Sequence, residues 1–469
     1  SGLFSQPSGL FSQPSGLFSQ PSGLFSQPLA IHNTPNDFHN SHPPQKHLPP
    51  MQAPMQDPME ALPAPAQPKS LKNIPVIRPP VFDLNTPENI QIADEYAKVN
   101  GFVLVWVHKN KEEATAFARE TVLEVWTSIV EDLALRPDLL ARLISGGFTI
   151  TDDESLDKFM GPLPRAFFRE LYAILGKNIY LHSGFGAPAS NRSFNLRVLW
   201  KLRQNTMLDA FAQRFLGTKD VKCSLDRPIC KFHGKGDQEF LHLDKQPFSE
   251  PILDMISGKY CVSESSFICV PGSNNWNQEI KTHYQEFYKK KKSAKWGLDP
   301  NKPDRLNLFE KTRKLIVPAN CMVMWMQDTI HGVVKNTTGR IAFGLYVGFS
   351  KDVERAQYEQ VHNTPEVQDR FRVYSKGVAP KGFPSCDKTQ LYPLRFQNFH
   401  TRIGDFTDKM DKTAGQYGFT RRKLNNRDEW VPHLVEYPPI DYTPPELSKR
   451  GKELLVGKRR VREFFGDDE

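Results

Sequence analysis

The sequence predicts a mainly β protein in which antiparallel strands form a sandwich or barrel, helices cover one face of it, and a disordered tail precedes the folded part. Between Cys223 and Phe349, short segments that alternate apolar and polar residues are separated by turn residues, as in SSFICVPGS and CMVMWM. Before this region, apolar residues recur at helical spacing. With 469 residues, 39% of them hydrophobic, the chain is long enough for one large core or two smaller ones.

The first 80 residues lack the composition of a folded core. Residues 1–28 are four copies of SGLFSQP, and the Gly and Pro in every copy exclude a continuous helix. We interpret the repeat as a flexible spacer, with a string of short Leu-Phe docking motifs as the alternative. Residues 29–80 are rich in Pro, Gln, His and Met and are predicted to be extended. The expected division is a disordered tail at 1–80, a folded domain at 81–350 and a carboxy-terminal extension at 351–469.

Helices are predicted on both sides of the strand-rich region. Their limits come from apolar periodicity and from glycine, proline and capping signals. The carboxy-terminal extension, rich in aromatic residues and proline, is expected to wrap the core and to end in a basic tail. The predicted elements are a short helix ending at Gly101, a strand over 102–107, a helix over 111–135 stopped by Pro137, a helix over 196–216 stopped by Gly217, and a helix from Thr443 to Val456.

Composition limits which cellular compartments and which partners are expected. The net charge of +8 permits anionic partners but is small for this length and does not by itself indicate nucleic acid. Six scattered cysteines form no CxxC pair, which favours free thiols in a reducing compartment. No apolar run reaches the roughly 20 residues that span a bilayer, so no membrane span is expected. We expect an intracellular protein, cytoplasmic or nuclear, although the chain begins with Ser1 and leaves any signal before it unread.

Two histidines and an aspartate are the candidate metal ligands. Residues two apart on a strand point the same way, so His242 and Asp244 share one face of FLHLDK while Leu241 and Leu243 share the other. His331 follows the apolar segment CMVMWM and a polar turn, a position at the mouth of a barrel. Two imidazoles and one carboxylate can hold a ferrous ion and leave one face open. The alternative is structural: a strand-end histidine beside a solvated aspartate, and a second histidine with a structural role at the barrel mouth.

Arg340 lies nine positions after His331 and begins a strand with two unlike faces. One face carries bulky residues, whereas the face shared by Arg340, Ala342 and Gly344 is dominated by small residues and leaves room for a ligand. An inward arginine without a counter-charge is costly, so we expect an anion beside it. That anion is either an internal Asp or Glu, or a bound carboxylate.

These motifs, taken in order, resemble the iron(II)- and 2-oxoglutarate-dependent dioxygenases. SSFICVPGSNNW is similar to the "vPGSH" segment of the phytanoyl-CoA dioxygenase group, and VPANCMVMWMQDTIHGVVKNTTGR is similar to that group's distal segment. DEYAKVNGFVLVWV resembles its opening helix and "GF" strand, so the resemblance spans about residues 90–350. It implies a double-stranded β-helix, a jelly-roll or cupin-like core with helical support.

The resemblance also implies a chemistry. His242, Asp244 and His331 would bind Fe(II), Arg340 would bind the distal carboxylate of 2-oxoglutarate, and Lys231 would lie near that cosubstrate. With O2, and ascorbate in support, the enzyme would hydroxylate a small-molecule or lipid-type substrate and release succinate and CO2. Related halogenases lack the carboxylate ligand, so its presence favours hydroxylation or another oxidation. The chain departs from the family in having Asn274 where the PGSH histidine stands.

Two other functions stay open at this point. An insertion rich in Lys and aromatic residues, including Lys289–Lys292, could bind nucleic acid or another anionic group, or it could be a solvated loop. Binding would favour an oxidase of a modified nucleic-acid base or a protein side chain. The remaining alternative is a non-catalytic β-sandwich that serves as a binding or structural module. The sequence carries no signal for an oligomeric state.

Overall fold

The computed structural model divides the chain into two units, Ser1–Pro63 and Ala64–Glu469, and all described residues lie in the second. The predicted tail up to residue 73 and the insertion Lys289–Lys292 lie outside the described residues. These residues are 74–132, 137–175, 181–182, 187–188, 192–233, 241–244, 255–288, 296–297, 304–332, 335–352, 366–377, 382–383, 392–393, 419–424, 427–432 and 442–466.

Two β-sheets face each other in the core. The larger sheet has the order β2 (Val81–Asp83), β3 (Phe102–Trp106), β13 (Cys321–Met326), β9 (Met255–Cys261), β15 (Ala342–Lys351) and β6 (Val221–Cys223), with β7 (Pro228–Lys231) also paired to β15. The smaller sheet has the order β1 (Val76–Ile77), β12 (Arg313–Val317), β10 (Ser265–Cys269), β14 (His331–Gly332), β8 (His242–Leu243) and β11 (Trp296–Gly297).

The order of the strands defines a jelly roll. Strands β7, β9, β13 and β15 belong to the larger sheet, while β8, β10, β12 and β14 belong to the smaller one, so the chain crosses repeatedly between sheets. Neighbouring strands within each of these sets of four are antiparallel. The predicted mainly β core with flanking helices is therefore confirmed.

Three apolar clusters form the layers, one on each outer face and one between the sheets. Helices cover the outer face of the larger sheet, where Val105, Met324 and Val347 pack against them. The cluster between the sheets contains Val323 and Trp325 from one sheet and Phe267 from the other. On the outer face of the smaller sheet, Leu241 and Leu243 pack with residues of α8 (Asn277–Tyr288) and α9 (Leu308–Lys311).

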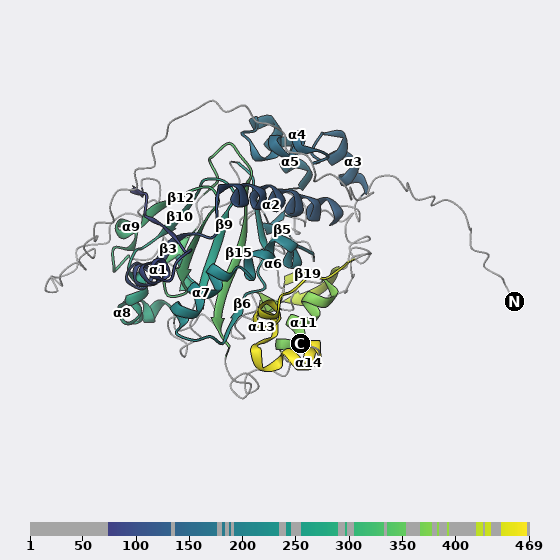
Figure 1. Ribbon diagram of the computed structural model, residues 1–469. Coiled ribbons are helices and arrows are strands. Elements are labelled where there is room, and N and C mark those ends of the chain that lie inside the picture. Colours follow the sequence, from purple (N-terminus) through teal and green to yellow (C-terminus); the bar gives the residue numbers. More distant parts are fainter. Residues whose placement is uncertain are drawn as a thin grey trace, which may run out of the picture. The chain divides into compact units, whose positions relative to one another are not determined.

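Helices before the jelly roll cover the larger sheet (Figure 1). The helix α1 (Pro87–Asn100) begins at the Thr86 cap and ends at Gly101, whose φ of 78° is a left-handed conformation that favours glycine. The other amino-terminal helices are α2 (Lys111–Asp132), α3 (Pro137–Ser145), α4 (Asp153–Met160), α5 (Arg165–Leu175), the 3-10 turn η3 (Arg192–Asn195), α6 (Arg197–Arg203) and α7 (Thr206–Leu216). Among the described residues, no helix is both long and apolar enough to cross a bilayer.

Three predicted helix limits differ from the structure. The segment 196–216 is two helices, because the Asn205 side chain accepts hydrogen bonds from the backbone of Met207 and Leu208 and starts α7. Pro137 begins α3 rather than only ending the helix before it, since proline fits the first turn of a helix. The last predicted helix starts at Lys449, where Ser448 rather than Thr443 is the cap. The glycine stop at Gly217 and the end of the last helix at Val456 are confirmed.

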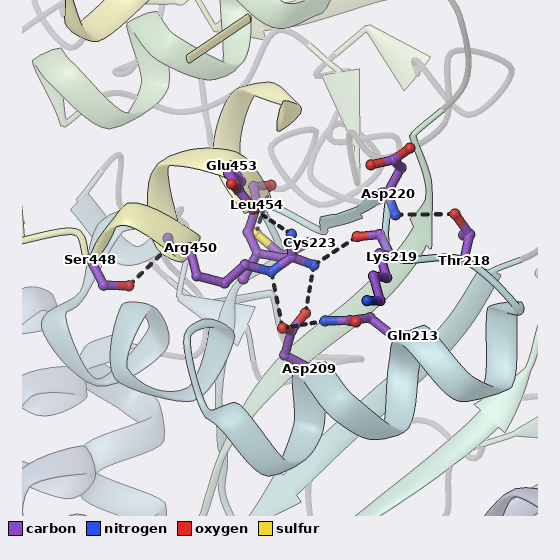
Figure 2. Close-up of polar contacts among 11 residues, drawn as sticks. Asp209, Gln213, Thr218, Lys219, Asp220, Cys223, Ser448, Arg450, Glu453 and Leu454 are labelled. Atoms are coloured by element: carbon purple, nitrogen blue, oxygen red, sulfur yellow. Dashed lines mark hydrogen bonds and ion pairs between the residues drawn. The ribbon is translucent and has the colours of Figure 1, made fainter. Parts of the chain in front are cut away.

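The carboxy-terminal helix α13 (Lys449–Val456) is bound to α7 through a partly buried ion pair (Figure 2). The Arg450 guanidinium donates to both carboxylate oxygens of Asp209, at 3.0 and 2.9 Å, and to Glu453 at 2.7 Å. Next to it, the Cys223 thiol of β6 lies 3.5 Å from the Leu454 carbonyl oxygen. Bidentate pairs of this kind fix both distance and orientation, so α13 is held against the sheet edge.

The remaining elements are short or belong to the carboxy-terminal part. Helix α11 (Glu366–Lys376) contacts α13 and η3, which joins the extension to the amino-terminal helices. These elements are η4 (Ser273–Asn275), α11 (Glu366–Lys376), η7 (Lys458–Arg460), α14 (Val461–Phe465) and the hairpins β4 (Leu181–His182) with β5 (Ala187–Pro188), β16 (Gly382–Phe383) with β17 (Tyr392–Pro393), and β18 (Phe419–Leu424) with β19 (Arg427–Pro432).

Candidate metal centre

The two candidate histidines lie on adjacent strands of the smaller sheet. His242 in β8 is the direct partner of His331 in β14, and the centroids of their rings are 4.4 Å apart. Leu241 and Leu243 pack on the outer face, so His242 and Asp244 point toward the space between the sheets, as the period of two predicts. Two strands thus bring residues 89 positions apart in the chain to one place.

One nitrogen from each histidine and one oxygen of Asp244 lie within 4.8 Å of one another. The Nε2 atom of His242 is 3.7 Å from Oδ1 of Asp244, and Nε2 of His331 is 3.5 Å from Oδ2. Both imidazoles are buried, whereas the Asp244 side chain keeps 17% of its surface exposed. The cluster is therefore accessible from the side of its carboxylate.

The backbone fixes the orientation of the His331 ring. Its Nδ1 atom lies 2.9 Å from the Thr329 carbonyl oxygen. A carbonyl oxygen can only accept, so Nδ1 carries the proton and Nε2 faces Asp244. In the neutral ring, Nε2 then has the lone pair that a metal ion requires.

Aromatic side chains form the wall behind the cluster. The Trp325 indole donates from Nε1 to Oδ2 of Asp244 at 3.2 Å, and its ring lies 5.2 Å from that of His331. Phe267 stacks on His331 with a centroid distance of 5.6 Å and an interplanar angle of 16°. The sequence alone assigns no role to either residue. The alternation in CMVMWM places Trp325 on one face with Val323, but only the folded structure brings the indole to Asp244.

The end of α1 and the PGSN segment position the turn before His331. Ser273 accepts a hydrogen bond from the Ile330 amide at 2.8 Å, and Thr329 donates to the Gly101 carbonyl at 2.6 Å. A Cβ atom at Gly101 would lie 2.4 Å from Thr329 Oγ1 and 2.8 Å from Asn274 Oδ1. Real Cβ atoms do not approach other atoms so closely, so this contact requires glycine.

Asn274, at the position of the histidine in the segment that the sequence resembles, belongs to the same contact. Its amide nitrogen donates to the Lys98 carbonyl at the end of α1 at 2.9 Å. It is buried, and its Oδ1 atom has no hydrogen-bond partner in the part of the chain that the structure describes. The residue therefore links α1 to the PGSN segment and is not among the three candidate ligands.

The structure brings the backbones of Arg340 and Lys231 together through Asn336. Lys231 ends β7, opposite Ala342 at the start of β15, and the Asn336 amide nitrogen donates to the carbonyl oxygens of both Lys231 and Arg340 at 2.8 Å. The Arg340 guanidinium donates to the Met160 carbonyl at 3.2 Å. Among the described residues, no Asp or Glu pairs with Arg340, so the internal counter-charge considered from the sequence is not observed there.

Nearby cysteines do not offer competing thiolates. The five described cysteines are free and buried, and Cys269 lies directly opposite His331. Burial raises the pKa of the Cys269 thiol, and it raises that of Cys321 to about 12. Only the thiolate is a good metal ligand, and burial disfavours the thiolate of Cys269 and Cys321.

The partly buried carboxyl group of Asp226 lies close enough to Asp244 to interact with it electrostatically. Burial raises the pKa of Asp226, and the negative charge of Asp244 raises it further. Arg227 and Arg203 oppose this effect. The positive charges beside Asp226 thus limit the build-up of negative charge next to the candidate centre.

No protein-family model and no curated protein matches the chain. It is similar to solved structures that include two non-heme alpha-ketoglutarate-dependent enzymes, SnoN and SnoK. The epimerase SnoN, in complex with Fe3+, alpha-ketoglutarate and nogalamycin RO, is 11% identical with a TM-score of 0.32, over 57% of this chain and 85% of that chain. The carbocyclase SnoK from nogalamycin biosynthesis is 12% identical with a TM-score of 0.29, over 58% and 90%. AviO1 from Streptomyces viridochromogenes Tue57 is 14% identical with a TM-score of 0.29, over 56% and 95%.

Proposed function

We propose that this protein is an Fe(II)- and 2-oxoglutarate-dependent oxygenase that hydroxylates a small-molecule or lipid-type substrate. The observation that carries the proposal is the convergence of His242, Asp244 and His331 within 4.8 Å on the inner side of a jelly roll. Two nitrogens and one oxygen, grouped on one side of a point, are the donor set that non-heme iron oxygenases use.

The donors fit a divalent ion in charge and orientation. His331 presents Nε2 because Thr329 holds its other nitrogen, and Asp244 supplies the negative charge. A divalent ion held by these groups keeps a net positive charge, which attracts an anionic 2-oxo acid. Fe(II) bound there would activate O2 and couple decarboxylation of 2-oxoglutarate to substrate oxidation.

The remaining residues of the site would orient the metal ligands and shield them from water. Trp325 holds Oδ2 of Asp244 and would keep this carboxylate oriented for a bound metal ion. Phe267 and the apolar cluster between the sheets exclude water from behind the imidazoles. On the inner face of β15, Ala342 and Tyr346 are only half-buried, which is compatible with a ligand beside them. Lys231 and Arg340, held together by Asn336, would attract the anionic cosubstrate.

The test is metal binding followed by uncoupled turnover. Purified protein is titrated with Fe(II) without oxygen, and succinate is then measured after adding 2-oxoglutarate, ascorbate and air. We expect binding of one ion and slow succinate formation even without substrate. Asp244→Ala and His331→Ala should abolish both, whereas His283→Ala, on α8 outside the smaller sheet, should leave both intact.

Two results would contradict the proposal. The first is a wild-type protein that binds no divalent metal, which would favour a non-catalytic β-sandwich. The second is tight Zn2+ binding without 2-oxoglutarate-dependent succinate, because two histidines and a carboxylate also suit catalytic zinc. Panels of metabolites, lipids and oligonucleotides, scored by faster succinate release, would then identify the substrate class.

A further inference from the structure

Lys259 of β9 is a buried cation whose only polar partner in the described part of the chain is a neutral hydroxyl. The residue is 8% exposed, and its Nζ donates to Ser265 Oγ at 3.0 Å. Among the described residues, no carboxylate lies within ion-pair distance of it. Burial of an ammonium group beside one hydroxyl is unfavourable, so an anion is expected to complete this environment.

The ammonium lies between the two sheets. Lys259 pairs with Val323 of β13 on one side and with Tyr346 of β15 on the other. It shares its face with Cys261, and Cys261 and Val323 belong to the apolar cluster between the sheets. Its partner Ser265 belongs to β10 of the opposite sheet, so the side chain extends across the interior.

Lys259 lies one step deeper in the jelly roll than the candidate metal centre. Trp325, which donates to Asp244, is two residues from Val323 on the same face of β13, a displacement of about 7 Å along the strand. The Tyr346 ring, beside Lys259, is 6.3 Å from the Trp325 ring. An elongated ligand that binds a metal ion held by Asp244 and extends inward would therefore approach Lys259.

Partial exposure on this inner face is compatible with a ligand. Ser257, Ser265 and Tyr346 surround Lys259 on the inner faces of their strands, and all three are half-buried. On the outer face of the same strands, Tyr260 and Leu345 are fully buried beneath the helices. The polar and accessible groups of β9 and β15 are thus on the side that faces the candidate metal centre.

We propose that Lys259, with Ser265, binds the distal carboxylate of the dicarboxylic 2-oxo acid. This proposal rests on the proposed function and departs from the resemblance, which assigns this role to Arg340. The Arg340 guanidinium instead donates to the Met160 carbonyl at the end of α4. Lys259 would contribute a charge-assisted hydrogen bond, and the Ser265 hydroxyl could donate a second one to the same carboxylate.

The experiment compares two ligands that differ only in the distal carboxylate. Binding of 2-oxoglutarate and of 2-oxobutyrate to the Fe(II)-loaded protein is measured without oxygen, from the visible charge-transfer band of the Fe(II)–2-oxo acid chelate. Wild type should prefer 2-oxoglutarate. In Lys259→Met, we expect 2-oxoglutarate to bind at least about tenfold more weakly, about 1.4 kcal/mol, while 2-oxobutyrate binds as before. Lys259→Arg should retain part of the preference.

Matched variants separate this role from a structural one. Lys314→Met removes a lysine from β12, on a face opposite to the inner residue Leu315, and should change neither affinity. Because Lys259→Met also removes an unpaired buried charge, the ligand-free variant should be at least as thermally stable as wild type. A marked loss of stability would assign Lys259 a structural role and overturn the proposal.

The remaining outcomes are equally decisive. If Lys259→Met keeps the preference for 2-oxoglutarate while Arg340→Met loses it, Arg340 is the anchor and this proposal is wrong, although the proposed function stands. If wild type binds Fe(II) but gives no chelate with either acid, the proposed function fails and this proposal fails with it. Should Lys259→Met not fold, Ser265→Ala provides the second test, with a smaller but selective loss for 2-oxoglutarate.

Discussion

Replacement of Trp325 by phenylalanine tests whether Asp244 is held in place for a metal ion. The change removes the indole N–H that donates to Oδ2 of Asp244 at 3.2 Å and keeps an aromatic ring against Phe267 and His331. A hydrogen bond to a charged acceptor contributes roughly 1.5 to 3 kcal/mol, and the length of this one places it at the low end. About 1.5 kcal/mol corresponds to metal binding weakened about tenfold. A loss of this size is typical for groups that orient a metal ligand.

The assay is calorimetric titration with Mn2+, an air-stable substitute for Fe(II), beside thermal unfolding of each variant. Trp106→Phe is the matched control, since Trp106 lies on β3 of the same sheet and packs against His108. Both variants should lose about 1 to 2 kcal/mol of stability from reduced packing, but only Trp325→Phe should lose metal affinity. Equal metal affinity in Trp325→Phe and wild type would refute the reasoning, because the indole would then not orient the carboxylate.

For three further substitutions, the structure predicts the direction of the change in metal affinity, in stability or in the pH dependence of stability. Ser273→Ala removes the bond to the Ile330 amide and should weaken Mn2+ binding by about threefold to tenfold in the same titration, with intact folding by circular dichroism. Arg450→Met leaves Asp209 without its bidentate partner and should lower the free energy of unfolding in urea by about 2 to 3 kcal/mol; a loss below about 0.5 kcal/mol would contradict this. Burial lowers the pKa of His108, so stability should fall as pH drops below about 6.5 toward the folded-state pKa, and His108→Phe should flatten that dependence.

The sign of the His108 effect follows from proton binding. The unfolded histidine takes up a proton near its ordinary pKa, whereas the folded one, packed among Trp106, Phe117 and Tyr260, resists protonation. Below the ordinary pKa the unfolded state binds more protons, and stability decreases by up to about 1.4 kcal/mol per pH unit for this one group. A stability curve unchanged by His108→Phe between pH 5 and 7 would show that other groups dominate.

The alternation of side chains between the two faces of a strand was a sequence pattern that agreed well with the structure. It predicted that His242 and Asp244 share a face opposite Leu241 and Leu243, and the packing of the leucines against α8 and α9 agrees. A period of two is a property of the backbone, so it holds wherever the strand forms. Helix limits were less predictable, because the apolar pattern continues across 196–216 while the Asn205 cap divides the segment.

Contacts between distant segments were not readable from the sequence. The hydrogen bond from Trp325 to Asp244 joins residues 81 positions apart, and the link from Ser273 to Ile330 joins residues 57 apart. Neither has a local signature, because each depends on how the two sheets and α1 pack. The resemblance assigned Arg340 to the cosubstrate by position alone, whereas the direction of its guanidinium depends on α4.

The distribution of charge between the two faces of the larger sheet has an energetic reason. Its outer face, from Val105 to Val347, packs against helices in an apolar cluster that stabilises the fold. Its inner face carries Lys259, which lowers stability when no anion is bound. A buried charge that lowers stability can be retained where ligand binding requires it, because selection acts on function and only requires stability to stay above a threshold. Ligand-free Lys259→Met should therefore gain stability and lose selectivity together, a combination that a purely structural lysine would not produce.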